Sequence, residues 1–102
     1  MNSHDEMRKE RITEYLKKMG ISTSCSGYKA LFSAIMIASR KPELSCAEIF
    51  SETALELIGP SVTKEQEKTI YGNAYYAIKH NKSVKYEGGP YNFIKDCSVE
   101  LE

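Results

Sequence analysis

The sequence predicts an all-α fold, a single compact bundle of five to six helices that contains a helix-turn-helix. Apolar residues recur at three- and four-residue intervals, no segment alternates with period two, and capping and glycine signals bound the helical stretches. The 102 residues have room for one domain, and 41% of them are hydrophobic, enough for a core. We expect a polar lead with the start of the first helix over residues 1–11, and the helical domain over 12–101.

The first two predicted helices cover residues 5–19 and about 27–41. One apolar stripe at helical spacing runs along the first helix, formed by Ile12, Tyr15, Leu16 and Met19. Gly20 is expected to end that helix, because glycine adopts positive φ without a Cβ clash. Apolar residues cover most of the circumference of the second helix, so we expect it to be the central, buried one.

The next two predicted helices begin with capping boxes. Ser45 and Glu48 open the third, which ends at Gly59, and Thr63 and Gln66 open the fourth, which runs to about residue 81. The expected buried face of the third helix is Ile49, Phe50, Ala54, Leu57 and Ile58. The expected inward face of the fourth is Ile70, Ala74, Ala77 and Ile78. A short last helix is expected over 91–101.

Charge is distributed unevenly along the chain. Fourteen Lys and Arg balance fourteen Asp and Glu, so the formal net charge is zero. Glu48, Glu52 and Glu56 repeat every four residues and form one acidic ridge on the third helix. Residues 61–86 carry five lysines against two glutamates, a net charge of about +3. The zero total therefore conceals a basic segment beside an acidic one.

The third and fourth helices are joined by the short turn Gly59-Pro60-Ser61-Val62, the size of turn found in a helix-turn-helix. In that motif the second helix enters the major groove of duplex DNA. Lys64, Glu65 and Lys68 are the base-side candidates, while Ser61 and Thr63 are candidates for phosphate or capping contacts. The remaining DNA-binding candidates are Tyr71, Lys79 and Lys82. Together with Lys85, the last two are expected to contact the phosphate backbone of the DNA. Two antiparallel helices of an ordinary bundle are the alternative interpretation.

A resemblance is carried by Met19-Gly20-Ile21, a short polar loop, then Gly27-Tyr28 and an apolar helix. This order resembles the C-terminal DNA-binding domain of the master sporulation response regulator of endospore-forming Firmicutes. Residues 67–81 line up with the recognition helix of that family, and 92–101 with its last helix. The resemblance covers residues 12–101 and implies a helix-turn-helix domain that binds duplex DNA in tandem or as a homodimer, in transcription regulation linked to sporulation.

The chain departs from that family in two ways. Where the family carries arginines on its recognition helix, this chain has Glu65, Lys68 and Tyr71, and Gly72 replaces a family histidine. The length also leaves no room for the phosphoacceptor receiver domain of the family's regulators. An alternative therefore stays open, a protein-interaction module that kept the fold and lost DNA binding.

Other function classes find little support in the sequence. The three cysteines (Cys25, Cys46 and Cys97) form no Cys-x-x-Cys pair, and no nucleophile, P-loop or dinucleotide motif occurs. We expect no enzyme, no catalytic residue, no metal site, no cofactor and no small-molecule substrate. No apolar run is long enough to span a bilayer, so we expect no membrane partner and a cytoplasmic location. The tyrosines are expected in the core or at its edge, although Tyr75 projects away from the inward face of the fourth helix. Stacking on nucleic-acid bases is the alternative interpretation for Tyr71, Tyr75, Tyr76, Tyr86 and Tyr91.

Overall fold

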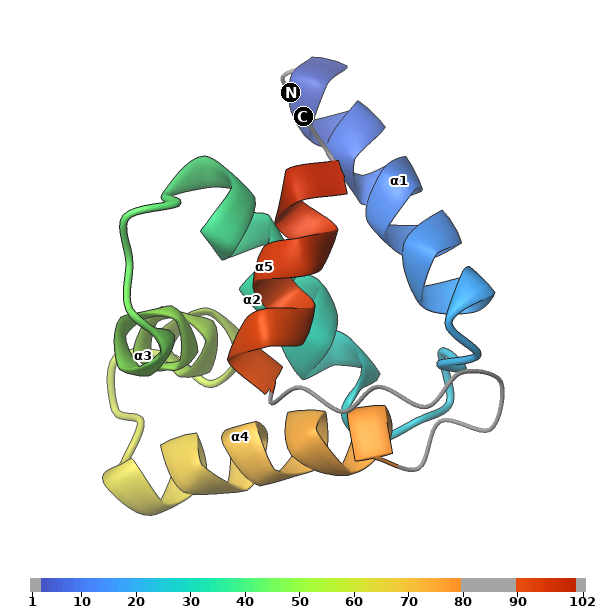
Figure 1. The fold of residues 1–102 in the computed structure, drawn as a ribbon. Helices are drawn as coiled ribbons and strands as arrows, with labels where there is room; N and C mark the ends of the chain where they lie inside the picture. The colour runs from blue at the N-terminus through green and yellow to red at the C-terminus, as the bar shows by residue number, and fades with distance from the viewer. Residues whose placement is uncertain (1–2, 80–89, 101–102) are drawn as a thin grey trace.

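The structure is a computed structural model that describes residues 3–79 and 90–100. Five helices account for most of these residues, and no strand occurs among them. In order they are α1 (Ser3–Lys18), α2 (Tyr28–Arg40), α3 (Cys46–Leu57), α4 (Lys64–Lys79) and α5 (Pro90–Glu100). Figure 1 shows how they pack around one another. The all-α prediction is confirmed, and none of the described helices is long and apolar enough to cross a membrane.

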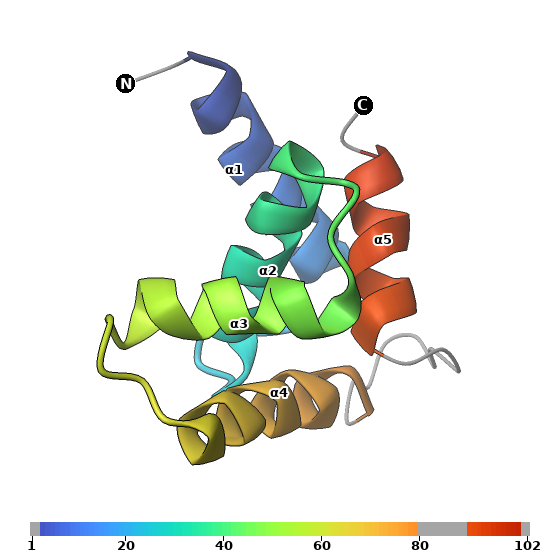
Figure 2. The same ribbon diagram turned by 90° about the vertical axis from the view of Figure 1, so that its left-hand side faces the viewer.

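Helix α2 lies at the centre and contacts each of the other four helices. Eight of its thirteen residues are buried, and Leu31, Ala34 and Ile35 are fully inaccessible to solvent. Figure 2 shows α5 beside α2, with α3 running across α2. Fully buried side chains that complete the core include Ile12, Leu16, Ile49, Phe93, Ile94 and Cys97. The sequence-based prediction of a central α2 is confirmed.

The end of α1 is fixed by a Schellman motif. Gly20 has a φ of 82°, and its N–H donates to the Lys17 carbonyl at 3.0 Å. The N–H of Ile21 reaches back to the Leu16 carbonyl at 2.9 Å, and both side chains belong to the core. This hydrophobic contact directs the following loop toward the start of α2. The predicted role of Gly20 is confirmed.

The start of α2 packs directly on the backbone of α4. A Cβ built at Gly27 would lie 2.1 Å from the carbonyl oxygen of Asn73 and 2.9 Å from the Cβ of Ala77. Only hydrogen fits in this space. Because Ala74 and Ala77 are small and buried, the two helices can approach this closely.

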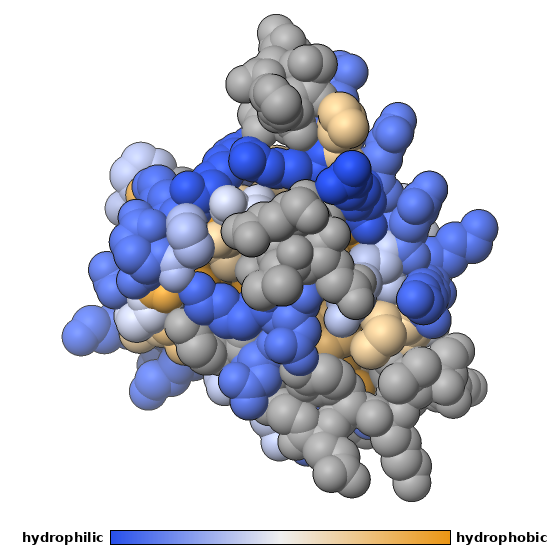
Figure 3. Space-filling model, turned by 45° about the horizontal axis from the view of Figure 1, so that its top comes forward, coloured by the Kyte–Doolittle hydropathy of each residue, from blue (hydrophilic) through white to orange (hydrophobic). Residues whose placement is uncertain are grey.

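The predicted buried face of α3 is only partly correct. Ile49, Phe50 and Ala54 are buried, together with Thr53, whose hydroxyl donates to the Ile49 carbonyl at 2.8 Å. Leu57 and Ile58 are each 42% exposed, so their prediction as core residues is wrong. The helix ends at Leu57, and the chain turns away from the core there. Figure 3 shows, on the face that it presents, a mainly hydrophilic surface with small apolar areas.

We expect Gly27→Ala to lower the free energy of unfolding by about 1–3 kcal/mol, the usual cost of overpacking. The added methyl group would collide with the Asn73 carbonyl and force α2 and α4 apart. Urea denaturation followed by circular dichroism measures the change.

Gly72→Ala is the matched control, because a Cβ at Gly72 meets nothing within 4 Å and the residue lies inside α4. Replacing a helical glycine by alanine should raise the free energy of unfolding by about 1 kcal/mol. Equal effects of the two substitutions would contradict the described contact between α2 and α4.

Candidate nucleic-acid interface

A closed turn and a capping box connect α3 to α4. Gly59 has a φ of 119°, and the N–H of Val62 donates to its carbonyl at 3.1 Å. The backbone N–H of Gln66 then donates to the Thr63 hydroxyl at 3.2 Å, while the Gln66 side chain accepts from the Thr63 N–H at 2.8 Å. The predicted capping box is confirmed, and the Thr63 hydroxyl serves as the cap of α4.

Helices α3 and α4 cross at a wide angle. Figure 1 looks nearly along the axis of α3, while α4 runs across the same view. Their seam contains an edge-to-face pair between Phe50 and Tyr71, with ring centroids 5.0 Å apart and planes at 74°. Tyr71 is 38% exposed, and its partial burial raises the pKa of its phenol. Tyr71 therefore joins the two helices and also reaches the surface.

The outward face of α4 carries lysines and tyrosines on either side of Gly72, a residue without a side chain. Its inward residues are those expected, Ile70, Ala74, Ala77 and Ile78. Lys68, Gly72 and Tyr75 are exposed along the centre of the opposite face, at helical spacing. The ammonium of Lys79 lies 5.4 Å from the centroid of the Tyr75 ring, a cation–π contact. A partner can approach the α4 backbone closely at Gly72, where no side chain intervenes.

The structure brings together the predicted residues that lie near the start of α4. Exposed side chains in this group are Ser61, Thr63, Lys64, Glu65 and Lys68. Lys79 is also exposed, but it stands about 16 Å further along the helix axis than Lys68. Lys82 and Lys85 lie outside the described residues.

The acidic ridge of α3 is engaged in contacts within the domain. The Glu48 carboxylate accepts from the Ser45 N–H at 3.1 Å, which completes the predicted capping box of α3. Glu52 forms a salt bridge with Lys41 at 2.8 Å. Successive residues of an α-helix are rotated by about 100° around its axis. The Glu52 side chain therefore points about 160° away from that of Phe50, which packs against Tyr71 of α4. The middle of the ridge therefore points away from the seam with α4.

The last member of the ridge, Glu56, joins α3 to α2. Its carboxylate accepts a hydrogen bond from the hydroxyl of Ser33 at 3.1 Å. Ser33 is 6% exposed, so this bond satisfies one of the two buried polar side chains among the described residues.

Two neighbouring tyrosines of α4 are exposed. Tyr75 is 41% exposed, as expected from its position off the inward face, whereas Tyr76 is 55% exposed, so its expected place in or beside the core is wrong. The signal was present, because the inward face at positions 70, 74, 77 and 78 already turns both rings outward.

Comparisons with known protein families, with curated proteins and with solved structures find no match for this chain. The helix-turn-helix and the resemblance to the sporulation regulator stay predictions.

We expect the acid sensitivity of the fold to depend partly on Glu48. Hydrogen bonds from the backbone and hydroxyl of Ser45 lower the pKa of this carboxyl. Its stabilising contribution is therefore present above the pKa of an unfolded glutamate and is lost as pH falls through the lower folded value. Glu48→Gln keeps an acceptor at the capping position but does not titrate. The variant should lose less Tm between neutral and acidic pH than the native chain.

Glu10→Gln, an exposed change on α1, is the matched control and should leave the native pH dependence almost unaltered. Identical Tm profiles for the native chain and Glu48→Gln would contradict the role of the ionised cap.

Proposed function

We propose that this chain is a DNA-binding domain of a transcription regulator, in which α3 and α4 act as a helix-turn-helix. The observation that carries the proposal is the outward face of α4, where exposed lysines follow a short closed turn. An α-helix fits the major groove of B-DNA, and the N-terminal residues of a recognition helix contact base edges there. The link to sporulation control is supported only by the resemblance in sequence.

The residues at the start of α4 divide between reading bases and holding phosphate. Lys68 donates to guanine acceptors, and Glu65 accepts from a cytosine amino group. Lys64, in the first turn of α4, is the third base-side residue, and the hydroxyl of Ser61 is close enough to the helix N-terminus to contact the DNA backbone along the same groove. The partial positive charge of that N-terminus adds to the attraction for phosphate.

The acidic ridge does not oppose this mode of binding. Glu52 is paired with Lys41, and Glu56 is turned toward Ser33. Neither carboxylate lies on the outward face of α4. The zero net charge of the chain is therefore compatible with a locally basic binding edge.

We expect the variant Lys64→Ala/Lys68→Ala to bind duplex DNA more weakly and with less dependence on salt. Each lost phosphate contact should reduce the slope of log K against log salt by about 0.9. Fluorescence anisotropy with mixed-sequence duplexes, from about 50 mM salt upward, measures affinity and slope together.

Lys9→Ala/Lys18→Ala removes the same charge from exposed positions of α1 and serves as the control. It should retain most of the affinity of the native chain. Absence of DNA binding by the native chain at low salt would refute the proposal, and so would equal loss in both double variants.

A second candidate function, protein interaction, is favoured by the exposed apolar residues at the end of α3. Leu55 is 50% exposed and Ile58 is 42% exposed, and the two follow at the i, i+3 spacing of neighbouring side chains. Apolar side chains gathered in this way are typical of contact surfaces between proteins. A second copy of the chain is the simplest partner, since the same patch can pair with itself across a twofold axis.

If this patch joins two copies, Leu55→Ser/Ile58→Ser should convert a dimer into a monomer. Light scattering after size-exclusion chromatography gives the mass directly. Ser51→Ala, an exposed change on the same helix, should leave the mass unchanged. A native chain that stays monomeric at high concentration would rule out the homodimer.

A further inference from the structure

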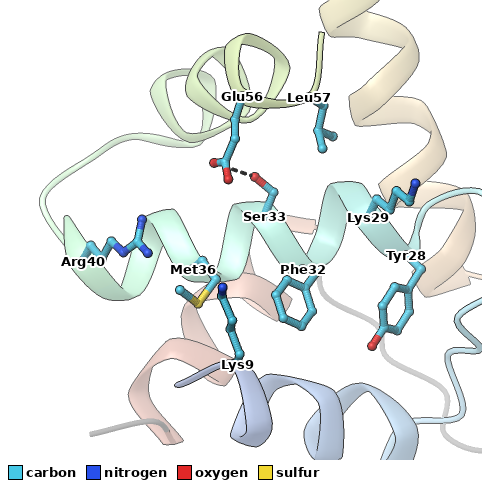
Figure 4. Close-up of a pocket in the computed structure, with 9 residues that line it drawn as sticks. All are labelled: Lys9, Tyr28, Lys29, Phe32, Ser33, Met36, Arg40, Glu56 and Leu57. Atoms are coloured by element: carbon cyan, nitrogen blue, oxygen red, sulfur yellow. Dashed lines mark hydrogen bonds between the residues drawn. The ribbon is translucent and has the colours of Figure 1, made fainter. Parts of the chain in front are cut away.

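A pocket of about 400 Å³ opens on the surface of α2, between α1 and α3. Figure 4 shows the lining residues. Lys29, Ser33, Met36 and Arg40 follow one another along α2 at i, i+4, i+7 and i+11, so they form one stripe that faces the gap. The volume is in the range of small-molecule sites in proteins. None of the candidate DNA-binding residues lines this pocket.

The floor and one wall of the pocket are apolar. Phe32 and Met36 come from α2, and Leu57 comes from the last turn of α3. The 42% exposure of Leu57 is explained by this position, because its side chain borders the pocket instead of entering the core. The ring of Tyr28 lies 6.1 Å from that of Phe32 and extends the aromatic surface toward the N-terminal end of α2.

The rim of the pocket is cationic. Lys9 extends from α1 toward α2, and Lys29 and Arg40 stand at the two ends of the stripe. The acidic side chain in the lining is Glu56, whose carboxylate already accepts from the Ser33 hydroxyl at 3.1 Å. The lining therefore contains three cationic side chains and one carboxylate, so its net formal charge is positive.

We propose that this pocket binds a small anionic amphiphile, a carboxylate attached to an apolar chain or ring. The apolar body covers Phe32 and Met36, and the carboxylate pairs with the ammonium of Lys9 at the rim. Lys29 and Arg40 add positive potential from either end, which favours an anion over a neutral molecule of the same shape. The proposal is independent of DNA binding.

The probes are anilinonaphthalene sulfonate, whose fluorescence rises in apolar surroundings, and decanoate as its competitor. We expect saturable binding of the dye and its displacement by decanoate. Decanol, which has the same chain without the charge, should displace the dye less effectively. Near-UV circular dichroism of the same samples must keep its native signal, because the dye also binds partly folded chains.

Two variants test the two halves of the pocket. Lys9→Glu reverses the charge at the rim and should weaken decanoate binding on the order of fivefold to tenfold. Leu57→Asp puts a charge on the apolar wall at an exposed position and should weaken binding at least as much. Lys64→Glu/Lys68→Glu changes the charge of α4 and should leave decanoate binding within about twofold.

Heteronuclear NMR of the native chain locates the bound decanoate. Shifts in the amide signals of Ser33, Met36 and Leu57 are expected, with little change along the outward face of α4. Three results would each overturn the proposal: no decanoate binding by the native chain, unaltered binding in both Lys9→Glu and Leu57→Asp, or displacement by decanol equal to that by decanoate.

Discussion

The fold depends on one requirement, that the apolar surface of α2 be covered. Its buried residues occupy most of the circumference of the helix, so removing a neighbouring helix would expose side chains such as Ile35 or Ala38 to water. Burial of a single leucine or isoleucine side chain contributes about 1.5–3 kcal/mol, and α2 contributes several such groups. The other four helices satisfy this requirement, each with an apolar stripe on one side only. Their polar faces then point outward, including the face of α4 that we propose binds DNA.

Local hydrogen bonds set where α3 and α4 begin. The capping boxes at Ser45 and Thr63 supply hydrogen-bond acceptors for backbone N–H groups that have no partner within the first turn of a helix. The turn between α3 and α4 can therefore stay short, and the two helices cross over the seam of Phe50 and Tyr71. The same geometry separates the charges, because the carboxylates of Glu52 and Glu56 are held on the side of α2.

The sequence predicted the features that are decided locally. Helix spacing gave the inward face of α4 and the place of α2, and capping residues gave the starts of α3 and α4. The exposure of Leu57 could not be predicted in this way, because it depends on where the chain leaves the core and on how α1 and α3 flank α2. The pocket was missed for the same reason, since a gap between three helices has no signature in any one of them. Tyr76 was missed although its helical position indicated exposure.

The cysteines of the core and the loop differ in how they can be reached. Cys97 on α5 is fully buried, whereas Cys25 in the loop before α2 is half-buried. A thiol reagent therefore reaches Cys97 only when α5 separates from the core, an opening that need not unfold the other helices. Labelling of Cys25 requires at most a rearrangement of the loop. Cys97 is thus a natural reporter for opening of the core, while Cys25 and the equally half-buried Cys46 at the start of α3 report motion at its edge.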